Sequence, residues 1–377
     1  MIVDISRLAG RLLAGRLPTG VDRVDIEYVR HFSHRCDALV RYRGKWIFFS
    51  HDDSLKLFDI LIQHDSSKLW MIRRMVAWYY FFSAAIPSAE RKLLNISHSG
   101  LDQDAYRQKL KQYRLKPIFF VHDLIPITHP EYSRPNEDIL HQYRMETVLR
   151  YAAGIIVNSH DTLKHLDRYA HNHSLPMPQV AVAHLAAAPL SSSRSKSLMT
   201  KPYFVMLGTI EPRKNHWLML HVWRQIIERL GEKSPTLLII GQRGWECENV
   251  VDMLERCDSI RPYVIEKSRC SDKELFGYLE HAQALLFPSF VEGYGMPLVE
   301  SLSIGTPVIA SDLSVFKEIA GNIPEYLSPL DGIGWEAMIV DYSDTNSTKR
   351  SAQMERLKNF ISPTWKKHFE IIDEFLG

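Results

Sequence analysis

Short apolar runs alternate with longer segments of helical periodicity along almost the whole chain, and this alternation restricts the fold more than any other feature. The early apolar runs read IVDIS, LVRYRGKWIFF, PIFFVHD, GIIVNS and QVAVAHL, and helical segments such as Glu137–Tyr151 lie between them. Strands that alternate with helices form βαβ units, which build a mostly parallel sheet covered by helices. The sequence therefore predicts an α/β fold.

A second alternating series follows Ser191–Ser197, a stretch of small polar residues typical of a linker. Its expected strands cover residues 203–207, 236–240, 263–265, 284–287 and 308–310. A length of 377 residues also fits about two domains. We expect a Rossmann-like domain over 1–190, a second over 200–360 and a terminal helix over 361–377. Ligands are expected in a cleft between the domains, at the carboxyl ends of the strands.

Charge, cysteine content and the first residues indicate which partners and which cellular location to expect. The 46 Lys and Arg residues nearly balance the 44 Asp and Glu residues, so charge gives no case for a nucleic-acid partner. The four cysteines have no metal-ligand spacing, which favours a reducing compartment and predicts no structural zinc. The first residues become polar too early for a secretory leader. We therefore expect a cytoplasmic protein.

An aromatic insertion around residues 70–87 has two interpretations. Its apolar core, MVAWYYFFSAAI at 75–86, is shorter than the roughly 20 residues needed to cross a bilayer, so no transmembrane helix is predicted. Arg73 and Arg74 precede it, and Trp70 and Trp78 are aromatics of the kind favoured at a lipid boundary. The segment is either a buried helix or helical hairpin, or a peripheral contact with the inner face of the cytoplasmic membrane.

The segment FPSFVEGYGMPLVE, residues 287–300, indicates a ligand-binding turn. A strand ends in a glycine-bearing loop, and Pro297 suits the first turn of the helix that carries Glu300. Backbone amides at such a helix start favour a pyrophosphate and the hydroxyls of a sugar. Glu292 and Glu300 could engage two hydroxyl-bearing parts of one ligand. The alternative is a solvated glutamate pair around a structural turn.

The segment GTIEPRKNH, residues 208–216, lies between an expected strand and an expected helix. Arg213 and Lys214 would stand at the carboxyl end of that strand, where a guanidinium and an ammonium could neutralise a diphosphate. A solvated basic pair is the alternative.

In the first half of the chain, His122 and Asp123 end the strand PIFFVHD and are expected to point into the cleft. A purely structural histidine is the alternative. Asp102-Gln-Asp104 spells a metal-binding DxD pattern, but no apolar strand precedes it, so we interpret it as a solvated helix start. No metal site is predicted.

Taken together and in this order, the segments at 208–216 and 287–300 resemble the family-four retaining glycosyltransferases of the GT-B fold. The resemblance is to the bacterial mannosyltransferase-like branch that builds exopolysaccharide and O-antigen. It is specific over residues 201–335, where GQRGW at 241–245, SDKEL at 271–275 and AGNIPEY at 320–326 also match. It is weaker in the N-terminal half.

The resemblance implies roles for individual residues. Glu292 would contact the transferred sugar, Glu300 the ribose hydroxyls, and Lys214 with Arg213 the diphosphate. Sugar and phosphate would also contact the loop and helix start formed by Gly293, Tyr294, Gly295, Met296, Pro297 and Leu298. Many relatives carry an arginine soon after the glycine that matches Gly208, where this chain has Thr209. Arg213 or a residue of the other domain would then take that role.

The resemblance also covers two places in the N-terminal half. Gly20, in the segment LPTGVDR, matches the family loop in which a glycine packs against the phosphates. A glycine at such a turn otherwise only supplies a permitted backbone angle. His122 and Asp123 match the family position near the reacting sugar.

The implied function is metal-independent transfer of mannose from GDP-mannose, with retention of configuration, to a lipid-linked saccharide or polysaccharide acceptor. No cofactor beyond the donor substrate is expected. A UDP-sugar or another GDP-sugar is an alternative donor. The alternatives from other classes are a non-catalytic GT-B scaffold or binding protein, a nucleotide-sugar epimerase and a phosphorylase.

Overall fold

The computed structural model describes residues 1–16, 18–83, 87–187, 198–199 and 201–377. The predicted linker Ser191–Ser197 lies outside the described residues. The chain divides into two compact units. The first unit comprises Met1–Thr128, Pro135–Leu185 and Trp365–Gly377, and the second comprises His129–Arg134 and Ala186–Thr364. This division differs from the expected ranges at two places, because the terminal helix joins the first unit and a short segment of the first half joins the second.

The first unit contains a seven-stranded sheet of order β3-β2-β1-β4-β5-β6-β7. Its strands are β1 (Ile2–Asp4), β2 (Asp37–Tyr42), β3 (Lys45–Phe48), β4 (Lys92–Asn95), β5 (Lys116–Val121), β6 (Gly154–Val157) and β7 (Val180–Val182). All neighbours pair in parallel except β2 and β3, which form an antiparallel hairpin. The single run LVRYRGKWIFF thus contains two strands with a turn at Arg43 and Gly44 between them.

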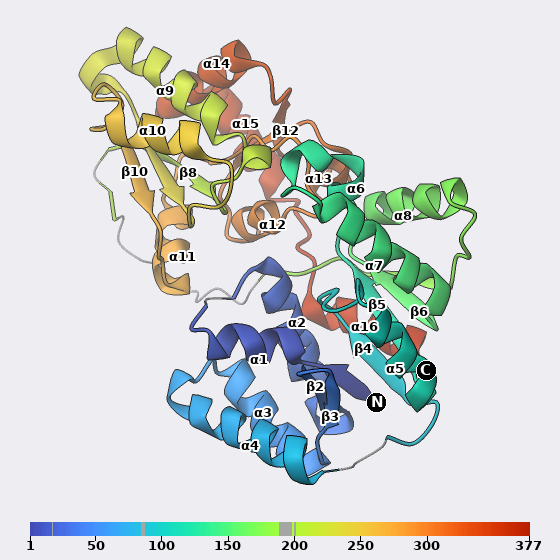
Figure 1. Cartoon of the computed structure of the whole chain (residues 1–377). Coiled ribbons are helices and arrows are strands. Elements are labelled where there is room, and N and C mark those ends of the chain that lie inside the picture. Colours follow the sequence, from blue (N-terminus) through green and yellow to red (C-terminus); the bar gives the residue numbers. More distant parts are fainter. Residues whose placement is uncertain (17, 84–86, 188–197, 200) are drawn as a thin grey trace. The chain divides into compact units, whose positions relative to one another are not determined.

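Helices cover both faces of this sheet, as its buried strands require. They are α1 (Ser6–Leu13), α2 (Gly20–Phe32), α3 (His51–Ile62), α4 (Leu69–Phe82), α5 (Asp104–Tyr113), α6 (Ile125–Thr128), α7 (Glu137–Tyr151), α8 (His160–Asn172) and α16 (Trp365–Leu376). The apolar residues of α5, α7 and α8 join one core with Phe119, Val121 and Ile155 of the sheet. Helices α2 and α3 lie on the other side of the strands (Figure 1).

The second unit contains a six-stranded, fully parallel sheet of order β10-β9-β8-β11-β12-β13. Its strands are β8 (Tyr203–Leu207), β9 (Thr236–Ile240), β10 (Val264–Lys267), β11 (Leu285–Phe287), β12 (Val308–Ser311) and β13 (Glu325–Leu327). The order places β8 beside β11, although three helices and two strands lie between them in the sequence. The loops after these two strands therefore meet at one edge of the sheet.

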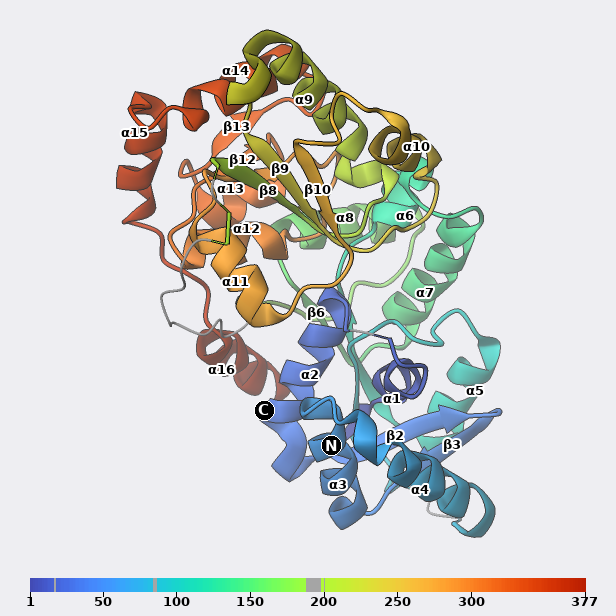
Figure 2. The ribbon, with the colours of Figure 1, turned by 90° about the vertical axis from the view of Figure 1, so that its left-hand side faces the viewer.

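The helices of the second unit are α9 (His216–Leu230), α10 (Glu248–Arg256), α11 (Asp272–Glu280), α12 (Met296–Ser303), α13 (Ser314–Ala320), α14 (Gly332–Ser343) and α15 (Thr348–Leu357). Helices α9, α10 and α14 share one core with the strands, in which Trp223 and Trp335 are completely buried. Helices α11 and α12 lie on the other side of the strands (Figure 2). Both units are thus Rossmann-like three-layer α/β domains, which confirms the predicted fold class.

The terminal helix α16 joins the first unit through specific contacts. The ring of His31 on α2 stacks on Phe369, with centroids 4.0 Å apart. His368 is buried, and its Nδ1 donates to the carbonyl oxygen of His184 at 3.0 Å while its Nε2 accepts from the hydroxyl of Tyr28 at 2.9 Å. Burial lowers the pKa of His368 to about 4, which keeps the ring neutral and able to accept.

The aromatic insertion contains one helix, α4, and its outer face is not buried. Ile72, Val76 and Tyr79 face the domain, whereas Trp78 is 54% exposed and Phe82 is 75% exposed. The interpretation as a buried helix or hairpin is therefore wrong for the outer face of α4. Only the stripe formed by Ile72, Val76 and Tyr79 is buried. Residues 84–86 lie outside the described residues.

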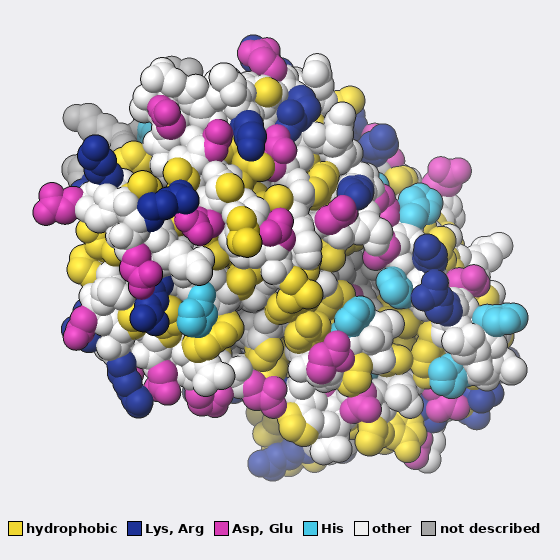
Figure 3. Space-filling view, turned by 90° about the horizontal axis from the view of Figure 1, so that it is seen from above, with side chains coloured by type: hydrophobic (Ala, Val, Ile, Leu, Met, Phe, Trp, Pro, Cys, Tyr) yellow, Lys and Arg dark blue, Asp and Glu magenta, His cyan; other side chains and the backbone are white. Residues whose placement is uncertain are grey.

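Among the described helices, none is long and apolar enough to span a bilayer. Basic and acidic side chains are interspersed over the face drawn in Figure 3, in keeping with the near balance of charge in the sequence.

Candidate functional site

The loop after β8 is fixed by glycines that allow close backbone contact. Gly208 has φ of +138°, and its amide donates to the carbonyl oxygen of Ile240 at 2.9 Å. A Cβ on Gly241 would lie 1.8 Å from the carbonyl oxygen of Gly208, so only glycine fits there. The amide of Gly244 then donates to the carbonyl oxygen of Ile210 at 2.9 Å. The GQRGW segment thus supports the loop that carries Arg213 and Lys214.

The loops after β8 and β11 are joined by direct hydrogen bonds. The amide of Phe290 donates to the carbonyl oxygen of Arg213 at 2.9 Å. Asn215, in a left-handed conformation with φ of +57°, uses its side-chain amide to donate to the carbonyl oxygens of Pro288 at 3.2 Å and Pro329 at 2.8 Å. Asparagine tolerates this conformation better than most residues. These bonds hold the basic pair against the segment that carries Glu292.

Four charged side chains meet where these loops touch. Arg213 binds Glu292 through Nη1 and Oε2 at 2.7 Å, and Glu211 through Nε and Oε1 at 2.6 Å. Lys214 donates from Nζ to Oε1 of Glu292 at 2.5 Å. The side chains of Glu292 and Lys214 are 7% and 10% exposed. Glu292 is therefore not part of a solvated glutamate pair, and Lys214 is not part of a solvated basic pair.

Burial and pairing act against each other on the pKa values of this cluster. Burial by itself would raise the pKa of Glu292, but the adjacent Arg213 and Lys214 lower it to about 2. For Glu211 burial prevails and its pKa is raised. Burial and the neighbouring Arg213 both lower the pKa of Lys214. The site thus holds two cations and two carboxylates, with Glu292 paired to both cations and Glu211 paired to Arg213.

Helix α12 begins directly after this cluster, as predicted. Gly295 precedes it with φ of +109°, and a Cβ there would lie 2.6 Å from the ring of Phe316. Pro297 stands in its first turn, and Glu300 lies within it, 5% exposed. Glu292 in the loop and Glu300 in the helix therefore have the expected local placement.

The other predicted contact positions differ in what they can offer a ligand. Gly293 and Tyr294 lie in the loop, and Met296 and Leu298 lie in the first turn of α12. Tyr294 and Leu298 are buried, and the amide of Leu298 already donates to the carbonyl oxygen of Gly295 at 3.0 Å. The roles of these residues toward a ligand stay predictions.

A segment from the first half of the chain packs on the same loops of the second unit, which the sequence did not predict. The ring of Tyr132 stacks on Phe290, with centroids 5.2 Å apart and 7° between the planes. The guanidinium of Arg134 lies 5.1 Å from the ring centroid of Trp245. The residues 129–134 therefore cover both the Glu292 loop and the GQRGW segment.

His122 and Asp123 line a polar pocket of about 420 Å3 in the first unit. His122 donates from Nε2 to the carbonyl oxygen of Ile96 at 2.6 Å. Burial lowers its pKa to about 4, so the ring is neutral near pH 7. Oδ1 of Asp123 accepts from the amide of Ile125 at 3.0 Å. The structure thus places both predicted residues at one pocket, while their chemical roles stay predictions.

Two further histidines in this pocket were not predicted. His141, which is 3% exposed, donates from Nε2 to the carbonyl oxygen of Asp123 at 3.1 Å. Its Nδ1 and the Nε2 of His98 are buried without a hydrogen-bond partner. The His98 ring centroid lies 5.5 Å from that of His122 and 5.6 Å from that of His141. Arg7, Arg144, Asp102 and Glu137 complete the charged lining.

Nothing in the sequence marks the two additional histidines. His98 is held in a left-handed conformation with φ of +58°, and His141 lies inside α7. Only the order of the strands brings them to the end of β5. Within the described ranges, no group of three or more His, Cys, Asp and Glu side chains is arranged to hold a metal ion.

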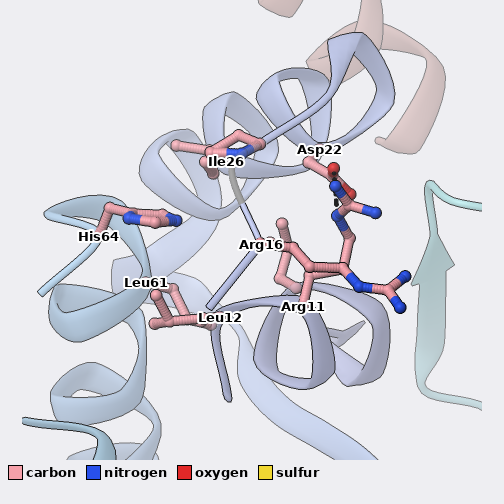
Figure 4. Close-up of a pocket in the computed structure, with 9 residues that line it drawn as sticks. Arg11, Leu12, Arg16, Asp22, Ile26, Leu61 and His64 are labelled. Carbon is pink, nitrogen blue, oxygen red and sulfur yellow. Dashed lines mark ion pairs between the residues drawn. The ribbon is translucent and has the colours of Figure 1, made fainter. Parts of the chain in front are cut away.

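Gly20 begins α2 at a tightly fixed turn. Asp22, which is buried, accepts from the amide of Thr19 at 2.7 Å and pairs with Arg7 at 2.9 Å and with Arg11 at 2.7 Å. Figure 4 shows the Arg11 side chain directed at Asp22. A Cβ on Gly20 would meet no atom within 4 Å, and its φ is not in the left-handed region. The local structure therefore does not require glycine at this position.

Comparison with known proteins shows which family these elements are similar to. The family "Glycosyl transferases group 1" matches residues 190–323, the segment that contains the basic pair and both glutamates. The serotype-specific mannosyltransferase WbdA of Escherichia coli is 26% identical over 273 residues, which are 67% of this chain and 32% of that protein. The O-antigen chain mannosyltransferase RfbU of Salmonella typhimurium is 23% identical over 96% of this chain and 95% of its own.

The chain spans 27% to 32% of the length of the WbdA proteins that it matches. Among solved structures, Anabaena Alr3699/HepE in complex with UDP and glucose superposes with a TM-score of 0.63 at 13% identity, covering 100% of this chain and 97% of that one. At that identity the likeness shows the fold alone. Residues 190–323 therefore match the group 1 glycosyltransferase family, and the chain has the GT-B fold and resembles the O-antigen mannosyltransferases.

Proposed function

We propose that this protein is a glycosyltransferase that moves a hexosyl group from a nucleotide sugar to a saccharide acceptor in bacterial surface-glycan synthesis. GDP-mannose is the proposed donor and mannose the transferred sugar, because the relatives WbdA and RfbU are named mannosyltransferases. A lipid-linked saccharide or a polysaccharide is the proposed acceptor. The cytoplasmic location stays a prediction.

The observation that carries the proposal is the buried pairing of Arg213 and Lys214 with Glu292. The two cations stand at the carboxyl end of β8, where open α/β sheets bind their ligands. A diphosphate could replace the Glu292 carboxylate as the partner of both cations. Such an exchange would keep the buried charge balanced and would free the glutamate for the hydroxyls of the sugar.

This arrangement supplies what cleavage of a nucleotide sugar needs. The bond between the anomeric carbon and the diphosphate oxygen breaks, the sugar gains oxocarbenium character, and the diphosphate takes the electron pair. Arg213 and Lys214 would stabilise that developing negative charge in a water-poor site, where such an interaction is strongest. Paired with Arg213 and Lys214, Glu292 has a pKa of about 2, so its carboxylate is ionised before the diphosphate arrives. We therefore assign it to positioning the sugar.

The acceptor would bind at the histidine pocket of the first unit. The Nδ1 of His141 and the Nε2 of His98 are buried and lack donors, and a neutral imidazole nitrogen without a proton accepts hydrogen bonds. Hydroxyl groups of a saccharide supply such donors. Asp123 and Arg144 in the same lining offer a carboxylate and a guanidinium to further hydroxyls. The mixture of acceptors and donors suits a sugar better than an apolar ligand.

Retention and metal independence are part of the proposal. The acceptor hydroxyl would attack the anomeric carbon from the face that the diphosphate leaves, and its proton would pass to the departing phosphate oxygen. A glycosyl adduct on Glu292, detected by mass spectrometry, would contradict this path. Activity that persists in EDTA would support metal independence, and activity restored only by a divalent cation would contradict it.

The first experiment is thermal melting of the purified chain with GDP, UDP, ADP and their sugar conjugates. A ligand at 100 times its Kd stabilises the folded protein by about 2.7 kcal/mol, which shifts the melting temperature measurably. The Lys214→Ala variant should lose this shift. Lys317→Ala is the matched control, because Lys317 also pairs with a carboxylate, that of Asp312, but lies outside the proposed site.

The outcomes separate the alternatives. Selective stabilisation by GDP and GDP-mannose, lost in Lys214→Ala and kept in Lys317→Ala, supports the proposal. Selectivity for UDP would keep the transferase and replace the donor. Absence of any response would favour a non-catalytic scaffold. Transfer of labelled mannose to a lipid-linked saccharide, followed by assignment of the anomeric configuration, then tests the reaction itself.

A further inference from the structure

We propose that the outer face of α4, together with the tip of the β2–β3 hairpin, docks on the interface of a bilayer that contains anionic lipids. We call this region the α4 surface, and it consists of Trp70, Arg73, Arg74, Trp78, Phe81, Phe82 and the hairpin residues Tyr42, Arg43 and Lys45. Binding at the α4 surface would not depend on glycosyl transfer.

Helix α4 is fixed to the first unit by its inner face only. Ile72 and Val76 are buried, and the hydroxyl of Tyr79 donates to Oδ2 of Asp53 at 2.7 Å. These residues recur at helical spacing, so the opposite stripe is directed away from the domain. The fold thus presents α4 lengthwise, with one face held and the other open.

The open face carries large aromatic side chains in contact with solvent. Trp70 is 58% exposed, Trp78 54%, Phe81 74% and Phe82 75%. In the second unit, by contrast, Trp223 and Trp335 are completely buried. A contiguous group of exposed aromatics on a folded protein marks a binding surface, and tryptophan is favoured where an apolar region meets water.

Positive charge accompanies these aromatics on the same surface. Arg73 and Arg74 are exposed on α4, and the sequence of this helix, LWMIRRMVAWYYFF, contains no acidic residue. The hairpin tip adds Arg43 and Lys45. Lys45 donates from Nζ to the carbonyl oxygen of Tyr80 at 3.1 Å, which fixes the tip beside the end of the helix.

This combination favours a lipid surface over a groove on another protein. An amphipathic helix that lies in a membrane interface places aromatic and aliphatic side chains among the acyl chains and its cations among the phosphates. Four cations from two elements, Arg43, Lys45, Arg73 and Arg74, complement anionic headgroups. With 14 residues, α4 is too short to cross a bilayer and can lie along it.

The test is sedimentation of the full chain with vesicles of phosphatidylcholine alone and with added phosphatidylglycerol. We expect binding to the anionic vesicles, little binding to the neutral ones, and release at high salt, because phosphate contacts are screened. Tryptophan fluorescence should shift to shorter wavelength on binding. A chain that stays in the supernatant with both kinds of vesicle would overturn the proposal.

Three combined variants locate the surface. Trp78→Ser with Phe81→Ser and Phe82→Ser should abolish binding, and Arg73→Gln with Arg74→Gln should remove the preference for anionic vesicles. Trp217→Ser with Ile361→Ser is the matched control, since these side chains are 45% and 90% exposed in the second unit, and it should bind like the parent.

Melting curves establish that each variant is folded, and light scattering gives its oligomeric state. Binding of the serine variant equal to that of the parent overturns the proposal. So does a dimer of the parent chain that the serine variant loses, because the α4 surface would then be an interface between two copies.

Discussion

Lys214 and Glu292 form a nearly buried ion pair, with 2.5 Å between Nζ and Oε1, although 78 positions separate them in the sequence. The parallel order of β8 and β11 brings their loops to the same edge, and the amide of Phe290 locks one loop to the other. Lys214 also lies 5.0 Å from the ring centroid of Phe287, which shields it from water. The fold thus holds both cations against one buried carboxylate, the pairing on which the proposed function depends.

The first prediction is an asymmetry in stability between the two partners. Glu292→Gln leaves the buried Lys214 without its carboxylate and should destabilise the chain by about 3–5 kcal/mol. Lys214→Met should cost less, because Glu292 then keeps Arg213. Urea unfolding of both variants measures the difference. Equal losses, or a larger loss for Lys214→Met, would contradict the view that Lys214 depends on Glu292 alone.

The second prediction ranks the two glutamates in nucleotide binding. Glu300→Ala should weaken binding of the free nucleoside diphosphate more than Glu292→Ala, since only Glu300 is assigned to the ribose. Removal of Glu292 leaves Lys214 without the carboxylate that pairs with it, which favours an anion. Isothermal titration of both variants gives the ranking. The reverse order would overturn the ribose assignment.

The third prediction separates two glycines by their surroundings. Gly295→Ala forces a Cβ to within 2.6 Å of the Phe316 ring at a φ of +109°, so it should lower the free energy of unfolding by about 1–3 kcal/mol or more. Gly20→Ala has open space around the new Cβ and should leave stability within about 0.5 kcal/mol of the parent.

Nucleotide titration completes this comparison. If phosphates approach the backbone at Gly20 as the family resemblance implies, Gly20→Ala should weaken nucleotide binding while the chain stays fully folded. The local fold does not require glycine at this position, so an effect on binding would come from the ligand. Nucleotide affinity equal to that of the parent would therefore show that the phosphates make no close contact at Gly20.

The sequence predicted regular elements best where their apolar pattern was unambiguous. The bounds of β8, β9 and α7 agree with the expected ranges. It missed α1 and β4, and it merged β2 and β3 into one run, because a two-residue turn such as Arg43-Gly44 interrupts the apolar pattern only briefly. Helix α16 was predicted as a helix, but its place in the first unit depends on the fit of Phe369 to His31.

The candidate site was predicted only as far as its local motifs reach. Arg213, Lys214 and Glu292 were singled out, because each stands in a loop after a strand. Glu211 was not, since nothing in the sequence shows that it is buried and paired with Arg213. His98 and His141 were not predicted either, because the sequence does not show that they are buried in the same pocket. Contacts between distant segments depend on strand order, which the order of elements along the chain does not determine.

The last prediction concerns pH and rests on histidines that burial keeps neutral. Burial lowers the pKa of His122 and His368 to about 4 and that of His216 to about 3, compared with 6.5 for the exposed side chain. The unfolded chain therefore binds more protons than the folded chain between pH 6.5 and about 4. The free energy of unfolding should therefore fall as the pH decreases through this window. Above the window, the contribution of the neutral histidines to stability is fully present.

Each of these histidines should reduce the free energy of unfolding by about 2 kcal/mol between pH 7 and pH 5, a window in which most carboxylates are still ionised. Urea unfolding at pH 7, 6 and 5 measures the loss. In His368→Gln, which has no titrating ring, the slope against pH should become smaller. A free energy of unfolding that is independent of pH over this range would mean that the buried rings are not held neutral.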